Sequence, residues 1–333
     1  MELSKPGYYD RFRCIASRCP DSCCRLWDVE IDPETVKLYK TLPGELGDLL
    51  REKLYEEDGA TYLGFEADGR CPMWREDGLC RIQAELGEQA LSRVCTDFPR
   101  LRHDFGDFQE LGLELSCPEA ARMILEQDSH SWVTEQAPQQ DEPDYDHEAM
   151  DLLKATRLTA RAILTDPHIS PAQALSQLLV YGYQAQSELD GEPVRPFDGE
   201  KALEAAADMA QSSDGAALRR FFLELEIMTD EWRQRLSRPD TLQPWGQSHR
   251  NLALYFVDRY WLQAVSDYDL VSRVKLAVTS TVLIHLLGGD LLRTAQLFSK
   301  EVENDADNID AILDGAYESP AMTDAQLFGL LNI

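Results

Sequence analysis

The sequence lacks any apolar run of the roughly 20 residues that a membrane-spanning helix needs. Its most apolar segment, residues 274–287, contains Lys275 and His285, which predicts a buried core helix. Residues 1–6 show neither the basic nor the apolar region of a signal peptide. We therefore expect a cytoplasmic protein with no membrane partner.

Basic residues are scarce. The chain has 32 Lys and Arg against 60 Asp and Glu, which gives a formal net charge of −28. Such a surface repels a phosphate backbone, so nucleic acid is not an expected partner. The same charge favours solubility, and it would attract a basic partner or a lysine-bearing substrate.

Histidine is also rare, with six residues in 333. His103 is the only one that precedes Cys117, and we expect it at the surface or in a hairpin. A mixed cysteine and histidine zinc site is therefore less favoured than a site made of thiolates alone.

Cysteine is absent after Cys117, and all eight cysteines fall in the first third of the chain. In a reducing cytosol this concentration favours metal binding or redox chemistry over structural disulfides. The spacings match neither zinc fingers and ribbons nor ferredoxin runs, so zinc and an iron–sulfur cluster both remain open. The predicted metal ligands are Cys14, Cys19, Cys23, Cys24, Cys71, Cys80, Cys95 and Cys117.

Turn residues and apolar periodicity predict how the chain is organised. Asp32 and Pro33 mark a helix start, and a helix opens after Cys117, whose thiolate would lie at a helix N-terminus. Short strands are expected at 27–31, 62–65 and 111–115, with a hairpin turn at 105–108 and irregular loop over 1–25. Further helices are expected at 148–165, 171–189, 199–211, 214–236, 248–266, 268–287 and 290–304.

These patterns predict a mainly α protein in two domains. The first, residues 1–127, would be a cysteine-rich, loop-rich, metal-binding domain with short strands. Residues 128–150 are acidic and would form a linker. The second domain, 151–333, would be an α-helical bundle.

Motifs in both halves resemble the flagellin lysine-N-methylase family, and the cysteine-rich half also resembles a broader group of zinc- or iron-chelating proteins. The N-terminal motifs are Cys14-x4-Cys19-x3-Cys23-Cys24, Gly69-Arg70-Cys71-Pro72, Asp77-Gly78-Leu79-Cys80, Leu86-Gly87, Cys95-x2-Phe98-Pro99-Arg100 and Leu115-Ser116-Cys117-Pro118-Glu119-Ala120-Ala121-Arg122. The C-terminal motifs are Tyr255-x3-Arg259-Tyr260, Arg273-Val274-Lys275-Leu276-Ala277 and Phe298-Ser299-Lys300-Glu301-Val302-Glu303-Asn304.

The resemblance implies an S-adenosylmethionine-dependent protein-lysine methyltransferase with flagellin as its substrate. It also implies a bound metal centre, an iron–sulfur cluster in preference to zinc. Methylation of an amine is a direct displacement that needs no radical, so such a centre would be structural or would position the cofactor.

The sequence has no Gly-x-Gly loop after a strand, so a Rossmann-type methyltransferase domain is not visible and the cofactor site must be unusual. The first candidate is the helix face that carries Tyr255, Arg259 and Tyr260. The second is a helix end with Lys300, Glu301 and Glu303. In either place the same residues would serve equally as core or as structural ion pairs.

Two other functions fit the same sequence. One is a non-catalytic metal-binding interaction or metal-carrier module, which the missing cofactor loop favours. The other is a redox protein that uses the thiols or the cluster for electron transfer. Binding of S-adenosylmethionine distinguishes a methyltransferase from a metal-binding module. A visible spectrum with metal analysis tests the redox protein.

Overall fold

Helices make up most of the chain, in a computed structural model that describes residues 1–25, 29–138, 142–241 and 243–331. Within these residues the α-helices are α1 (Pro33–Thr41), α2 (Gly44–Lys53), α3 (Arg81–Leu86), α4 (Arg93–Asp97), α5 (Pro118–Leu125), α6 (His147–Thr165), α7 (Pro171–Leu189), α8 (Gly199–Met209), α9 (Ala216–Leu223), α10 (Asp230–Ser237), α11 (Gln247–Tyr260), α12 (Leu270–Leu287), α13 (Leu291–Phe298), α14 (Ala306–Glu318) and α15 (Asp324–Leu330). The mainly α class is confirmed.

A four-stranded sheet lies against the helices in the order β5-β6-β1-β7. Its strands are β1 (Glu2–Pro6), β5 (Arg100–Asp104), β6 (Phe108–Leu113) and β7 (Trp132–Gln136). β1 pairs parallel with β6 and antiparallel with β7. The prediction of irregular loop over residues 1–25 is therefore wrong for Glu2–Pro6. Strand β1 forms there because its partners lie more than 100 residues away along the chain.

The acidic segment expected as a linker also contributes to this sheet, because β7 forms within it. Part of the segment, residues 139–141, lies outside the described residues. The domain limits at 127 and 150 stay a prediction.

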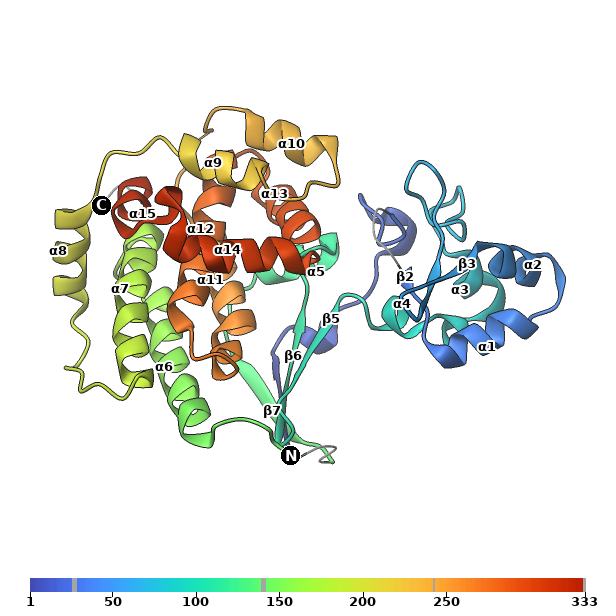
Figure 1. Cartoon of the computed structure of the whole chain (residues 1–333), viewed down its shortest axis with the longest axis horizontal. Helices are drawn as coiled ribbons and strands as arrows, with labels where there is room; N and C mark the ends of the chain where they lie inside the picture. The colour runs from blue at the N-terminus through green and yellow to red at the C-terminus, as the bar shows by residue number, and fades with distance from the viewer. Residues whose placement is uncertain (26–28, 139–141, 242, 332–333) are drawn as a thin grey trace.

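A second sheet, in the order β2-β4-β3, lies with helices α1 to α4, apart from the larger group of helices (Figure 1). Its strands are β2 (Val29–Glu30), β4 (Ala60–Leu63) and β3 (Leu54–Glu57). The strand predicted at 27–31 is confirmed at Val29 and Glu30, while residues 26–28 lie outside the described part of the chain. Asp32 caps α1 as predicted, since its carboxylate accepts the backbone N–H of Thr35.

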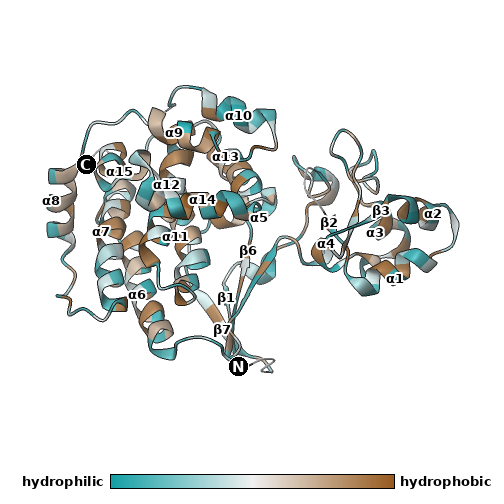
Figure 2. Cartoon of the chain, in the orientation of Figure 1, coloured by the Kyte–Doolittle hydropathy of each residue, from teal (hydrophilic) through white to brown (hydrophobic). Residues whose placement is uncertain are grey.

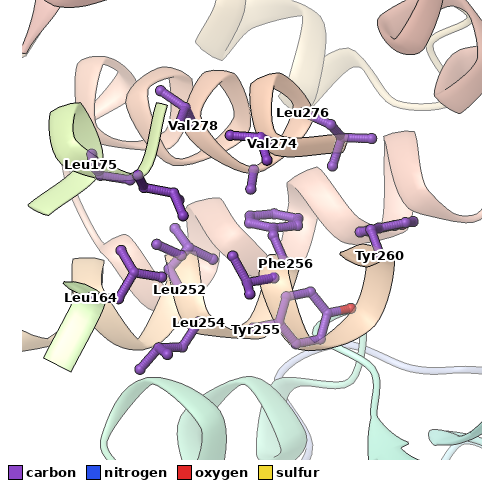
Figure 3. Packing of buried hydrophobic residues seen from close by; sticks show 14 of the residues in the cluster. Leu164, Leu175, Leu252, Leu254, Tyr255, Phe256, Tyr260, Val274, Leu276 and Val278 are labelled. Carbon is purple, nitrogen blue, oxygen red and sulfur yellow. The ribbon is translucent and has the colours of Figure 1, made fainter. Parts of the chain in front are cut away.

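Two separate groups of buried apolar residues form the cores. The smaller contains residues between Val29 and Ala90. The larger joins Tyr8, Phe12, the end of β6 and α5 with the helices from α6 onward. In Figure 3 the side chains of α11, such as Leu252 and Phe256, pack against Val274 and Leu276 of α12. The four-stranded sheet thus shares its core with the helices.

Most of the predicted helices are confirmed at their expected places. Hydrophilic and hydrophobic residues alternate along α6 and α7, as in helices with one buried face (Figure 2). Two predicted helices end early, because 3-10 and π-helical turns follow α11 and α13 at Trp261–Val265 and Ser299–Glu303. The single helix expected at 214–236 is two helices, α9 and α10. The break occurs because the Glu301 carboxylate accepts the backbone N–H groups of Met228 and Thr229, and because Thr229 caps α10.

Helix α12 is long and apolar enough to cross a membrane by length and composition, yet 94% of it is buried inside the protein. Lys275 lies within it and donates to the carbonyls of Ala316 and Met322 at 2.9 and 3.2 Å. The prediction of a core helix is confirmed.

A buried histidine pair at the end of this core predicts how stability depends on pH. His285 Nδ1 lies 3.2 Å from His249 Nε2, and the Trp245 ring stacks on His285. Burial, together with the neighbouring His249, lowers the pKa of His285 to about 4. The unfolded chain, with an imidazole pKa of about 6.5, therefore binds more protons than the native state between these two values.

We expect the free energy of unfolding to lose up to about 3 kcal/mol from His285 alone as the pH falls from 6.5 to 4. Urea titrations at several pH values would measure this loss. Replacing His285 with phenylalanine keeps a ring against Trp245 and should make the dependence shallower by the same amount. Equal pH slopes for the two proteins would contradict the prediction.

Candidate functional site: a charged hollow and a group of thiols

A hollow opens between the four-stranded sheet and helices α6 and α11. It holds about 570 Å³ of space free of atoms, its open mouth included. Its walls combine charged, aromatic and apolar side chains from segments that are far apart in the sequence. The lining residues are Pro6, Tyr8, Leu101, His103, Glu110, Leu111, Gly112, Leu113, Gln127, His130, Ser131, Trp132, Arg161, Leu254, Tyr255, Asp258 and Arg259.

Three ion pairs surround this hollow. Arg157 of α6 binds both oxygens of Glu110 on β6, with one contact of 2.7 Å. Arg161 pairs with Asp258, and Arg259 Nη1 lies 3.2 Å from Glu303 Oε1. The walls therefore offer both carboxylates and guanidinium groups at partly buried positions, a combination that suits a ligand carrying both charges.

Four of the residues singled out from the sequence meet at one buried carboxylate. Glu303 accepts the hydroxyl of Tyr255 at 3.1 Å and that of Tyr260 at 2.9 Å. Arg259 Nη1 donates to Tyr255 Oη at 2.5 Å, which shows that these two residues share a helix face as predicted. Although burial opposes its charge, the Glu303 carboxylate helps to hold the pKa of Arg259 well above its usual value.

Two of these four reach the hollow itself. Tyr255 and Arg259 line it, and in Figure 3 the Tyr255 ring lies on the side of α11 away from the side chains that face α12. Tyr260 and Glu303 do not line the hollow and support it from behind.

Lys300 and Glu301 belong to different contacts. Lys300 is buried and its Nζ lies 3.3 Å from Asp21 Oδ2. Glu301 binds the loop before α10, where it accepts the Met228 N–H at 2.8 Å and the Thr229 hydroxyl. The second candidate site is thus divided, and Glu303 is the member whose contacts lead to the hollow.

Sequence reasoning missed several residues of the hollow. His103 was expected at the surface or in a hairpin, and it lies on the hairpin strand β5, where it lines the hollow. Its Nε2 is buried and has no hydrogen-bond partner in the described part of the chain. Burial and the charge of Arg259 lower its pKa, so the ring is neutral near pH 7. Tyr8 and Trp132 lie in segments expected as loop and linker. The side chain of Trp132 is faced by the guanidinium groups of Arg157 and Arg161.

Five of the eight cysteines form one group, here named the five-thiol group: Cys23, Cys24, Cys71, Cys80 and Cys95. The Cys24 thiol hydrogen-bonds with those of Cys23 and Cys71, and the Cys80 thiol is near enough to act on it electrostatically. The Cys95 thiol is in similar range of Cys23 and Cys80. The Cys71 N–H also donates to the Cys24 carbonyl at 2.9 Å, so two distant segments are joined here.

The other three, Cys14, Cys19 and Cys117, form a second group. Burial raises the pKa of Cys117 to about 12, although the N–H groups of Ala120 and Glu119 at the start of α5 act to lower it. Burial therefore outweighs the expected helix-terminus effect. Cys19 is in electrostatic range of both Cys14 and Cys23, so the two groups adjoin.

The donor chemistry of these thiols fits a thiophilic metal. Among the described residues, no set of three or more His, Cys, Asp or Glu side chains is arranged to enclose a metal ion. The five-thiol group nevertheless concentrates soft ligands, which zinc and iron–sulfur clusters prefer. The hydrogen bond that the Cys23 thiol donates to Cys24 raises the pKa of Cys23, and desolvation raises the pKa of Cys95 to about 11. A bound cation would supply the charge that these thiols need in order to ionise.

The fold and the site together define a mainly helical protein with a charged hollow and, in a separate part of the chain, a group of thiols. No family model and no solved structure matches the chain. It is 36% identical over 132 residues to the lysine-N-methylase of Salmonella typhimurium and 35% identical over 133 residues to the flagellar biosynthetic protein FliU of Salmonella muenchen. A lysine-N-methylase of Salmonella choleraesuis is also 35% identical over 133 residues.

Each match covers 38% of this chain. The matched stretch makes up 78% of FliU and 33% of each lysine-N-methylase. The chain therefore spans about a third of the length of the two lysine-N-methylases. The chain belongs to the lysine-N-methylase family, as its motifs predict, and the matched stretch is too short to contain the N-terminal and the C-terminal motifs together.

Proposed function

We propose that the protein is a protein-lysine N-methyltransferase that uses S-adenosylmethionine and acts on flagellin in the cytoplasm. Membership of the lysine-N-methylase family carries this proposal. The name of FliU refers to the flagellum, which supports a flagellar protein as the substrate. The acidic chain, with its net charge of −28, suits a lysine-bearing partner.

We place the reaction in the hollow. S-adenosylmethionine is a zwitterion at its methionine end and supplies a methyl group on a positively charged sulfur. Arg259 would bind its carboxylate, Asp258 would face its ammonium group, and the rings of Tyr255 and Trp132 would contact its apolar parts. Placement of these groups around a partly enclosed space would orient the reactants and exclude water.

The lysine amine must lose a proton before its nitrogen can attack the methyl carbon. We assign His103 to receive that proton, because its ring is neutral and its Nε2 is without a hydrogen-bond partner among the described residues. Burial and the charge of Arg259 lower the pKa of His103, so the same surroundings must also lower the pKa of the bound lysine for this transfer to proceed. Replacing His103 with glutamine should lower the rate of methyl transfer about 100-fold and leave the affinity for S-adenosylmethionine within about twofold. Rates from labelled methyl transfer and affinities from calorimetry would test this, and an unchanged rate would exclude the role.

The five-thiol group would hold a metal centre, an iron–sulfur cluster in preference to zinc. No step of methyl transfer needs electron transfer, so we assign these thiols a framing role in the fold. Metal and sulfide analysis of protein purified without oxygen would identify the centre, together with a visible spectrum.

The decisive experiment measures transfer of labelled methyl groups to purified cognate flagellin, with a lysine-free flagellin variant as control. Transfer to the lysine-bearing protein alone supports the proposal. A protein with a reconstituted metal centre that transfers no methyl group would overturn it. In that case, absence of saturable binding of S-adenosylmethionine would favour a non-catalytic metal-binding module.

A further inference from the structure

A five-residue π-helical turn, η5 (Ser299–Glu303), lies between the hollow and the cysteine loop and contacts both. It follows α13 directly, and all five of its residues are buried. Turns of this kind contain one residue more than an α-helical turn and occur often at functional sites. Lys300 and Glu303 place two charged side chains inside the protein from this one turn.

The first end of the turn contacts the cysteine loop through Asp21, which lies between Cys19 and Cys23. Asp21 Oδ2 accepts hydrogen bonds from Arg293 at 3.0 Å, Gln296 at 3.1 Å and Lys300 at 3.3 Å. The Asp21 carbonyl also accepts the Cys19 thiol at 2.5 Å. Asp21 therefore attaches the loop that carries both groups of thiols to α13 and η5.

The second end of the turn contacts the wall of the hollow. Glu303 binds Tyr255, Tyr260 and Arg259, and its side chain is fully buried. Because Tyr255 and Arg259 line the hollow, the position of Glu303 sets the position of two of its side chains.

We propose that η5 couples the cysteine loop to the hollow, with Asp21 as a positioning residue for ligand binding. A change of this turn to the α form would shift its register by one residue and rotate one end against the other by about 100°. The contacts of Lys300 with Asp21 and of Glu303 with Arg259 both form in the π register. Binding that orders the cysteine loop therefore also stabilises the positions of Tyr255 and Arg259 that suit a ligand. A ligand in the hollow orders the cysteine loop in return.

Hydrogen exchange followed by mass spectrometry tests the coupling without metal or cofactor. Replacing Asp21 with asparagine should raise exchange about tenfold in residues 299–304, and Glu303→Gln should raise it similarly in residues 14–25. Asp240→Asn is the matched control, because it weakens a similarly buried ion pair, Arg219–Asp240, that contacts neither site. If each substitution acts on its own neighbourhood alone, the coupling is excluded.

Ligand binding provides the second readout, and this part rests on the proposed function. Asp21→Asn should weaken binding of S-adenosylmethionine about tenfold although Asp21 does not line the hollow, whereas Asp240→Asn should not change it. Unchanged affinity in Asp21→Asn would overturn the positioning role. If the unmodified protein itself fails to bind S-adenosylmethionine, the proposed function is wrong and the exchange data still decide the coupling. Should Asp21→Asn fail to fold, Arg293→Gln removes one of the groups that bind Asp21 and should give the same two changes.

Discussion

Replacing Arg259 with methionine should lower the free energy of unfolding by about 3–5 kcal/mol, because it removes the cation from a buried ion pair. The Glu303 side chain is fully buried, so its carboxylate would retain the hydroxyls of Tyr255 and Tyr260 and no guanidinium group. Methionine has a similar length, which keeps the loss of packing small. Urea denaturation would measure the change.

The double substitution Arg259→Met with Glu303→Gln is the informative control. It removes both charges together, so it should be more stable than the sum of the single effects predicts. Replacing Arg122, which is half exposed and pairs with its close neighbours Glu119 and Glu126, should cost less than about 1 kcal/mol. Additive effects in the double variant would show that Arg259 and Glu303 do not stabilise each other.

The same Arg259 substitution should weaken binding of S-adenosylmethionine about 10- to 100-fold, as expected for the loss of a charge-assisted hydrogen bond to the ligand. Calorimetric titration at a temperature where the variant remains folded would measure the affinity. A stable, folded Arg259→Met protein with unchanged affinity would remove Arg259 from the ligand site.

Replacing Cys24 with serine should reduce soluble yield, metal content and methyl transfer together. Cys24 lies between the thiols of Cys23 and Cys71, and serine supplies a hard oxygen in place of a soft sulfur ligand. The smaller core, between Val29 and Ala90, has far fewer buried residues than the larger one, so a bound metal would contribute a large share of its folding free energy. Metal analysis, circular dichroism and yield from matched cultures would measure the effect.

Cys14→Ser is the matched control for this substitution. Cys14 is exposed and belongs to the second group of thiols, so its replacement should change yield and metal content much less. A Cys24→Ser protein that folds normally, keeps its metal and loses only activity would contradict the framing role. The thiols would then belong to the reaction itself.

The sequence was most informative where local chemistry decides structure. The capped start of α1, the hairpin between β5 and β6 and most helices of the second half follow from turn residues and apolar periodicity. Strands β1 and β7 could not be predicted in this way, because each is stabilised by a partner far along the chain. Tyr8 and Trp132, which lie on or beside these strands, were missed as residues of the hollow for the same reason.

The candidate site shows the same limit. Tyr255 and Arg259 were predicted to share a helix face, and they do. Lys300, Glu301 and Glu303 were grouped because they are neighbours in sequence, yet the π-helical turn directs them to three different parts of the protein. Periodicity alone does not reveal such a turn, since it differs from an α-helix by one residue.

The pairing of β1 also has a consequence for the order of folding. Its neighbours β6 and β7 begin at Phe108 and Trp132, so a ribosome must extend the chain through both before this sheet can close. The segment around the smaller core is made in the interval and depends on contacts much nearer in sequence. Pairing over such separations is slow, because loop-closure entropy is lost before the strands gain their contacts. Strand β1 therefore becomes ordered only after the segment that separates it from β6 has been made.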